Sequence, residues 1–198
     1  MNGGTLDVTA ASRSISAPSD GRGIIMIQRC AVQTRDALVM NGGTLTANSD
    51  GTGIKVMGTL TMNGGTMTGK GSDYGVSSYE AMCMSGGTMT GEGVIVGVMI
   101  SDTLTMTGGT MNGTSTGDAY YGIYIYNDLE MSGGTINAEG DLYGVFTGYN
   151  LNLQGGSITI SGNAEMGVRC DVELTISGGI LDVDGPVYAW YAINIGEG

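Results

Sequence analysis

Residue types that carry out hydrolytic and nucleophilic catalysis are scarce in this chain. It contains no histidine, so it has neither a Ser-His nor a Cys-His nucleophile and no histidine-containing zinc site. Asp128 and Glu130, and likewise Asp171 and Glu173, lie two residues apart, which on a strand places both members of a pair on one face. A glycosidase needs two carboxylates placed across a substrate, one of them with a raised pKa, and no pair stands out here. We therefore expect a protein that is not an enzyme.

Aromatic side chains supply the remaining chemistry, and most of them fall between residues 120 and 150. An aromatic ring that faces solvent can pack against the apolar face of a sugar, while nearby carboxylates and amides bind its hydroxyl groups. The alternative is that rows of stacked tyrosines only stabilise a sheet by packing across strands. The candidate carbohydrate-binding residues are Tyr121, Tyr124, Tyr126, Tyr143, Phe146, Tyr149, Asp128 and Asn150.

These candidates are positioned by a repeat that runs along the chain. A Gly-Gly pair recurs at steps of 22 to 25 residues, after a first step of 39. A short cassette of alternating apolar and polar residues precedes each pair, a second one follows it, and a third apolar segment opens on Gly-Ile or Gly-Val. Alternation is typical of strands, and repetition at this spacing is typical of a solenoid. The first residues of the pairs are Gly3, Gly42, Gly64, Gly86, Gly108, Gly133, Gly155 and Gly178.

The repeat predicts an all-β protein, a parallel β-helix that spans residues 1–198 as a single domain, with three short strands in each coil of about 22 residues. Eight Gly-Gly pairs predict about eight coils, or a height of about 38 Å at 4.8 Å per coil. Equivalent residues then stack in columns, and the apolar columns that begin at Leu38, Met40 and Ile54 line the interior. The 14 methionines are explained as core residues, because an unbranched side chain fills a narrow interior.

The first, long step contains a segment, residues 9–35, in which polar residues and proline interrupt the pattern. We interpret it as a loop excursion from one coil, with Ala31 and Val32 returning to the third strand of that coil. Long loops on solenoids are frequent binding sites, and the alternative is a surface loop or a partial cap.

Three cysteines, Cys30, Cys83 and Cys170, fall in different coils and different columns. Their odd number and their separation predict neither a disulfide framework nor a metal cluster. Cys170 shares a column with interior residues and is expected inside, whereas Cys83 shares a column with outward threonines and is expected at the surface.

Charge restricts the class of partner. The net charge is −12, and from residue 71 onward Arg169 is the only cation, so nucleic acid is disfavoured as a partner. The start of the chain has no signal-peptide pattern and no run approaches 18 apolar residues, so we expect no insertion into a membrane. Because the repeat begins at Gly3 and strand-like alternation still continues at Ile195, we interpret the chain as a fragment of a longer repeat protein. Open strand edges would then allow end-to-end self-association.

The run from Gly53 to Thr68, with its Gly-Ile step, Leu-Thr-Met cassette and Gly-Gly-Thr turn, resembles the secreted bacterial carbohydrate-binding β-helix proteins, which are similar in fold to pectate lyases. The resemblance implies a right-handed helix, an extracellular or cell-surface location, polysaccharide binding and bound Ca²⁺. In that family an acidic residue before the Gly-Ile step helps to hold calcium. This sequence has no acid there, so we expect no cofactor; the position is held by Thr52, Tyr74, Val96, Tyr121, Tyr143 and Met166.

Three functional hypotheses follow. The first is a non-catalytic, extracellular surface module that binds a polysaccharide or cell-surface glycan. The second is a structural stalk or adhesin segment of a larger cell-surface protein, since Gly-Gly-Thr arrays also recur in bacterial adhesins and stalks. The third and minor one is ice binding by outward Thr-x-Thr ranks, whose hydroxyls and methyls form a regular grid. These ranks are Thr44 with Thr46, Thr66 with Thr68, and Thr88 with Thr90.

Overall fold

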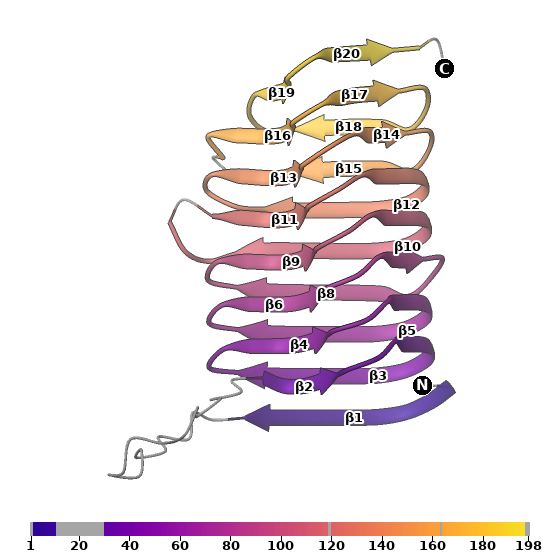
Figure 1. The fold of residues 1–198 in the computed structure, drawn as a ribbon, viewed down its shortest axis with the longest axis vertical. Coiled ribbons are helices and arrows are strands. Elements are labelled where there is room, and N and C mark those ends of the chain that lie inside the picture. The colour runs from indigo at the N-terminus through magenta and orange to yellow at the C-terminus, as the bar shows by residue number, and fades with distance from the viewer. Residues whose placement is uncertain (1, 11–29, 119, 163, 197–198) are drawn as a thin grey trace.

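The computed structural model describes residues 2–10, 30–118, 120–162 and 164–196, which form twenty strands and no helix. All pairings between the described strands are parallel, and the strands stack into a solenoid of about seven turns (Figure 1). The predicted parallel β-helix is therefore confirmed. The turns number about seven and not the predicted eight, because eight Gly-Gly pairs, one per level, are separated by seven turns.

Two sheets form the walls of this solenoid. The 12-stranded sheet contains β1 (Asn2–Ala10), β3 (Leu38–Ser49), β5 (Leu60–Gly71), β7 (Met82–Met84), β8 (Thr88–Gly93), β10 (Leu104–Ser115), β12 (Leu129–Glu139), β14 (Leu151–Leu153), β15 (Ser157–Ile160), β17 (Glu173–Ile176), β18 (Ile180–Val183) and β20 (Ala192–Ile195). The 8-stranded sheet contains β2 (Cys30–Thr34), β4 (Thr52–Val56), β6 (Tyr74–Ser78), β9 (Val96–Ile100), β11 (Tyr121–Ile125), β13 (Tyr143–Thr147), β16 (Met166–Cys170) and β19 (Val187–Ala189).

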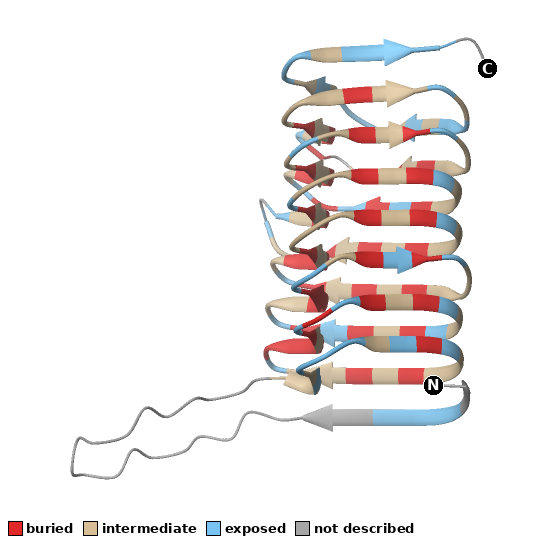
Figure 2. Ribbon diagram, turned by 45° about the vertical axis from the view of Figure 1, so that its right-hand side comes forward, coloured by how far each residue is buried: buried red, intermediate tan, exposed pale blue. Residues whose placement is uncertain are grey.

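The core consists of the predicted apolar columns. Parallel pairing keeps equivalent residues in register, so that Met84 pairs with Met106 and Ile123 with Val145. These four side chains are buried, as is Cys170, and Cys83 is exposed as predicted. Figure 2 shows buried residues alternating with more exposed ones along the strands, while β20 carries none that is buried. Period-two alternation alone thus separates the inside of each wall from its outside.

Each Gly-Gly pair forms a bend in the 12-stranded sheet. The second glycine of every pair has a positive φ, between 79° and 93°, which residues with a Cβ atom rarely adopt. Five strands, β1, β3, β5, β10 and β12, continue through the bend, because ladder pairing resumes after a local shift of register. The prediction of three strands per coil therefore holds where the cassettes form separate strands. It fails for β3, β5, β10 and β12, in which the two cassettes are one strand.

Two further glycine columns let the two sheets approach each other closely at one corner. A Cβ atom at Gly97 would overlap the backbone nitrogen of Thr114 and would lie 2.6 Å from the carbonyl oxygen of Gly122 and 2.7 Å from the backbone carbon of Gly113. All three neighbours are backbone atoms, which cannot rotate away as a side chain can. The glycine that opens the third segment at Gly97 is thus needed for close packing between the walls.

Both ends of the predicted excursion, residues 9–35, include strand residues. Strand β1 continues to Ala10 and β2 begins at Cys30, and residues 11–29 lie outside the described residues. Val32 pairs with Ile54, as its predicted return to the coil required. The described residues include no helix that is long and apolar enough to cross a membrane.

The Thr-x-Thr ranks lie on the 12-stranded sheet, where Thr66 pairs with both Thr44 and Thr88. Farther along the stack the second column continues as asparagine. Asn137 donates to Asn112 Oδ1 at 2.8 Å, and Asn112 donates to Thr90 Oγ1 at 3.3 Å. Polar ladders of this kind stabilise adjacent strands. The ice-binding hypothesis stays a prediction.

Candidate functional site

Four of the predicted site residues, Tyr121, Tyr124, Tyr143 and Phe146, pack together on the outer face of the 8-stranded sheet, and we call them the aromatic cluster. They come from β11 and β13, which pair in register. Tyr121 stacks on Tyr143 and Tyr124 stacks on Phe146, each with ring centroids 5.0 Å apart. Tyr121 also meets Tyr124 in a T-shaped contact at 5.2 Å. Rings that occupy one column in adjacent coils stack because the strand spacing nearly matches the stacking distance.

Arg169 closes this cluster from the next coil. Its guanidinium carbon lies 5.7 Å from the ring centroids of both Tyr143 and Phe146. Nη1 donates to the Tyr143 hydroxyl at 2.9 Å, and Nε donates to Asp171 Oδ1 at 2.8 Å. Tyr143 and Phe146 therefore each contact a ring from one neighbouring coil and the guanidinium from the other. Neither ring has a free face for a sugar.

Ionisation in the cluster follows from the same packing. Burial raises the pKa of Tyr121, and the neighbouring Tyr143 raises it further. Burial likewise raises the pKa of Tyr124, with Tyr121 as the next cause. The hydrogen bonds to Asp171 and Tyr143 raise the pKa of Arg169. At neutral pH Tyr121 and Tyr124 are thus uncharged, and Arg169 is a cation that forms an ion pair with Asp171.

We expect the aromatic cluster to act mainly on stability. Phe146→Ala should lower the free energy of unfolding by about 2 kcal/mol, because it removes stacked, T-shaped and cation–π contacts at once. Tyr126→Ala, which removes an exposed ring from the same coil as Tyr124, should stay within about 0.5 kcal/mol of the parent. Denaturant unfolding followed by circular dichroism measures both. Equal losses in the two variants would contradict a structural role for the cluster.

Tyr126 and Tyr149 lie elsewhere, on the turns that connect the 8-stranded sheet to the next coil. We call this row of stacked turns the turn edge; Figure 1 shows the turns one above another after β9, β11, β13 and β16. Tyr126 is 57% exposed and Tyr149 is 52% exposed. Their backbone is fixed by hydrogen bonds between coils, from Tyr126 N to Ile100 O at 2.9 Å and from Tyr149 N to Asn127 O at 3.2 Å. Both rings are therefore held at the surface by ordered backbone.

Asp128 and Asn150 accompany these tyrosines on the turn edge. Asn150 donates to Asp128 Oδ1 twice, from its backbone nitrogen at 3.0 Å and from Nδ2 at 2.9 Å. Within the described part of the chain, Asp128 Oδ2 makes no hydrogen bond. The pair is thus fixed in place and keeps one acceptor for a ligand hydroxyl.

Sequence analysis missed three aromatic residues near the turn edge, Tyr188, Trp190 and Tyr191. Trp190 is 61% exposed and Tyr191 is 76% exposed. Tyr188 meets Trp190 in a T-shaped contact at 6.3 Å. Aligning the last coil with the earlier ones would have placed Trp190 in the column of Tyr126. No Gly-Gly pair follows Gly178, however, so that alignment had no fixed point in the sequence.

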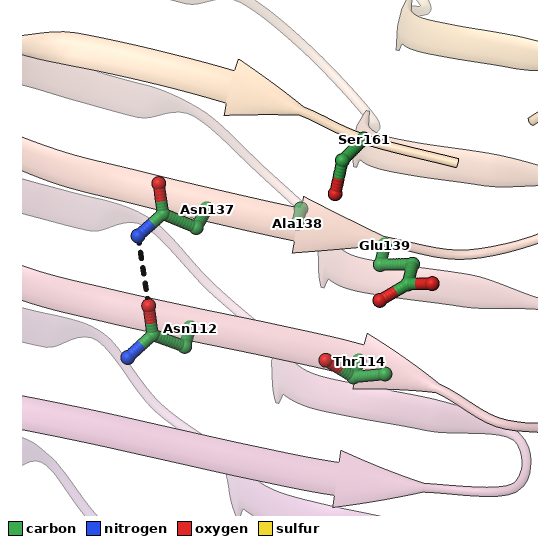
Figure 3. A pocket seen from close by; sticks show the side chains of 6 residues that line it. All are labelled: Asn112, Thr114, Asn137, Ala138, Glu139 and Ser161. Carbon is green, nitrogen blue, oxygen red and sulfur yellow. Dashed lines mark hydrogen bonds between the residues drawn. The ribbon is translucent and has the colours of Figure 1, made fainter. Parts of the chain in front are cut away.

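A polar pocket of about 170 Å³ lies on a different face, at the end of β12 and next to β10 (Figure 3). Amide, hydroxyl and carboxylate groups line it, and it contains no aromatic ring. Strand β15 ends at Ile160, one residue before Ser161, while β12 continues to Glu139, and this difference in strand length leaves the recess. The lining residues are Asn112, Thr114, Asn137, Ala138, Glu139 and Ser161.

Calcium does not fit the position that the family resemblance implies. The column before the Gly-Ile step contains Tyr121 stacked on Tyr143, and it offers no carboxylate ligand. Among the described residues, no group of three or more His, Cys, Asp or Glu side chains is arranged to hold a metal ion.

No protein-family model matches this sequence, and comparison with curated proteins and with solved structures finds no match either.

Proposed function

We propose that the protein is a non-catalytic, extracellular β-helix that binds a polysaccharide at the turn edge through Tyr126, Tyr149, Asp128 and Asn150. The observation that carries this proposal is the exposure of two tyrosines in adjacent coils beside a hydrogen-bonded Asp-Asn pair. Aromatic rings offer the sugar an apolar surface at a low cost in conformational entropy, and the polar pair offers acceptors and donors for hydroxyl groups. The backbone is ordered in advance, which limits the entropy lost on binding.

The aromatic cluster holds the backbone of the site in place and is not part of the surface that contacts the sugar. Tyr143 and Phe146 each lie between a ring and Arg169, and Tyr121 and Tyr124 each stack on one of these two rings. Tyr124 and Tyr126 alternate with the buried Ile125 along one chain segment, and packing of the first ring fixes the backbone that presents the second.

Affinity gel electrophoresis against a panel of polysaccharides tests the proposal. At least one glycan should retard the parent protein, and Tyr126→Ala and Tyr149→Ala should each weaken retardation about tenfold. Tyr79→Ala is the matched control, because Tyr79 occupies the register of Tyr126 two coils away but has Lys55 Nζ 4.8 Å from its ring centroid. The control should bind as the parent does. Absence of retardation by every glycan would refute the proposal.

A second candidate is a structural stalk or adhesin segment, and the unbroken pairing of both sheets along the stack favours it. Each coil contacts its neighbours through whole strands, which suits a rod that gives reach and resists extension. This function predicts no glycan binding together with high unfolding forces when the rod is pulled from its ends. Retardation that depends on Tyr126 would decide against it as the sole role.

A further inference from the structure

We infer that the binding surface continues along the turn edge to Trp190 and Tyr191, and that it selects an uncharged, linear polysaccharide lying parallel to the solenoid axis. This inference rests on the proposed function and extends the same site. We call Tyr126, Tyr149, Trp190 and Tyr191 the aromatic edge.

Backbone hydrogen bonds between coils place these four residues in two adjacent columns. In the first column the backbone N–H of each residue donates to the carbonyl oxygen of the last residue of the strand in the preceding coil, so the following residues occupy equivalent positions: Tyr126, Gly148, Asp171 and Trp190. Asn127, Tyr149, Val172 and Tyr191 form the second column, linked by Val172 N to Tyr149 O at 3.2 Å and by Tyr191 N to Val172 O at 2.9 Å. The aromatic edge therefore spans three coil steps, or about 14 Å along the axis.

Small neighbours keep the rings of the aromatic edge apart. Gly148 follows Tyr126 in its column, so no side chain covers Tyr126 from that coil; a Cβ atom there would overlap the Tyr126 carbonyl oxygen. Val172 separates Tyr149 from Tyr191 in the second column. In the aromatic cluster, by contrast, Tyr121 and Tyr124 of β11 each stack on a ring of β13. The edge thus leaves ring surface free where the cluster uses it for packing.

The spacing suits an extended sugar chain. Successive coils advance by about 4.8 Å, and an extended chain of pyranose units advances by a similar length per residue. A chain that lies along the turn edge can therefore place about one sugar unit on each coil, from Tyr126 to Trp190. A branched or globular glycan would meet only one or two of these rings.

Charge on the same turns excludes acidic polymers. Asp102 and Asp128 lie on the edge, and each accepts a hydrogen bond from an asparagine, at 2.6 Å from Asn127 Nδ2 and 2.9 Å from Asn150 Nδ2. Arg169, the only cation after residue 71, is engaged by Asp171. A polyuronate or a sulfated glycan would place its anions against these carboxylates without a free cation to bind them.

Trp190 makes the inference testable, because it is the only tryptophan in the chain and lies at the far end of the edge. Oligosaccharides of increasing length, prepared from the uncharged polysaccharide that gives the strongest retardation, would be titrated into the full chain while tryptophan fluorescence is recorded. Fluorescence should change with the same midpoint as binding. Affinity should rise with length up to about four sugar units and then level off.

Variants and a matched pair of polymers complete the test. Trp190→Ala and Tyr191→Ala should each weaken binding about tenfold with unchanged circular dichroism and melting, while Tyr79→Ala binds as the parent does. A methyl-esterified polyuronate should retard the protein at least tenfold more strongly than the same polymer after its esters are removed, because only the charge changes.

The outcomes separate this inference from the proposed function. Glycan binding that depends on Tyr126 but leaves Trp190 fluorescence and the Tyr191→Ala affinity unchanged would overturn the extension and keep the proposed site. Equal binding of the de-esterified polymer would overturn the charge selection. Binding only to cationic polymers, abolished by salt, would overturn the stacking mechanism. Failure of every glycan to bind would overturn the proposed function itself.

Discussion

Gly97→Ala is expected to lower the free energy of unfolding by about 3 kcal/mol or more. The added methyl group would overlap the backbone nitrogen of Thr114 and press on Gly122 and Gly113. Relief requires the two walls to separate at that corner, and separation in one coil disturbs the coils stacked on either side. A single methyl group added to a glycine with an ordinary φ is thus expected to destabilise the protein about as much as a core truncation does.

Gly196→Ala is the matched control, since the nearest atoms to a Cβ there lie at 3.6 Å, an ordinary contact distance. It should change stability by less than about 0.5 kcal/mol. Denaturant midpoints from far-ultraviolet circular dichroism compare the two variants with the parent. Similar midpoints for both variants would show that the corner can widen freely and that the close approach of the walls is not required.

Met106→Ala should cost about 2–5 kcal/mol. Met106 is fully buried and pairs with Met84 and Met131 in the coils on either side. Its truncation leaves a cavity, which the hydrogen-bonded strands cannot move to fill. Met106→Leu should cost less than about 1.5 kcal/mol, because it nearly conserves volume. The pair of substitutions separates the filling of space from any chemistry of sulfur.

Thermal melting with a parallel urea titration measures the Met106 variants. A loss in Met106→Leu as large as that in Met106→Ala would contradict the interpretation of the methionine columns as core residues. It would indicate a specific role of the thioether, such as packing against a Gly-Gly bend. At one such bend the side chain of Met84 lies close to Gly109.

Residue columns were predictable from sequence because the repeat is nearly constant in length. Counting residues between Gly-Gly pairs gives the pairing of Met84 with Met106 and of Ile123 with Val145. It also gives the burial of Cys170 and the exposure of Cys83. In a parallel stack one register fixes every column at once.

Continuity of strands was not predictable in the same way. Gly65 and Gly87 have nearly the same φ, 87° and 83°, yet β5 continues through its bend and β7 ends before its own. Apolar periodicity is the same before both bends, so it carries no information on where the ladder of hydrogen bonds is interrupted.

For the candidate site, sequence located the rings but not the direction in which they face. Tyr124 and Tyr126 are both outward residues in one segment, but Phe146 covers the first while Gly148 leaves the second open. The decisive residue in each case lies in the next coil. Predicting a free ring face therefore requires the register of two coils and the size of the neighbour, as well as the aromatic residue itself.

The rod can assemble coil by coil, because each described strand pairs only with strands of the adjacent coils. Strand partners such as Leu60 and Met82 lie one repeat apart, and pairings across several coils do not occur among the described strands. Each new coil needs only the previous coil as its template, so the coils can fold one after another. The time to add a coil is then independent of the number already folded. A chain delivered end first, from a ribosome or through a narrow pore, could fold as it emerges. The coils that have already folded would then prevent the chain from moving back.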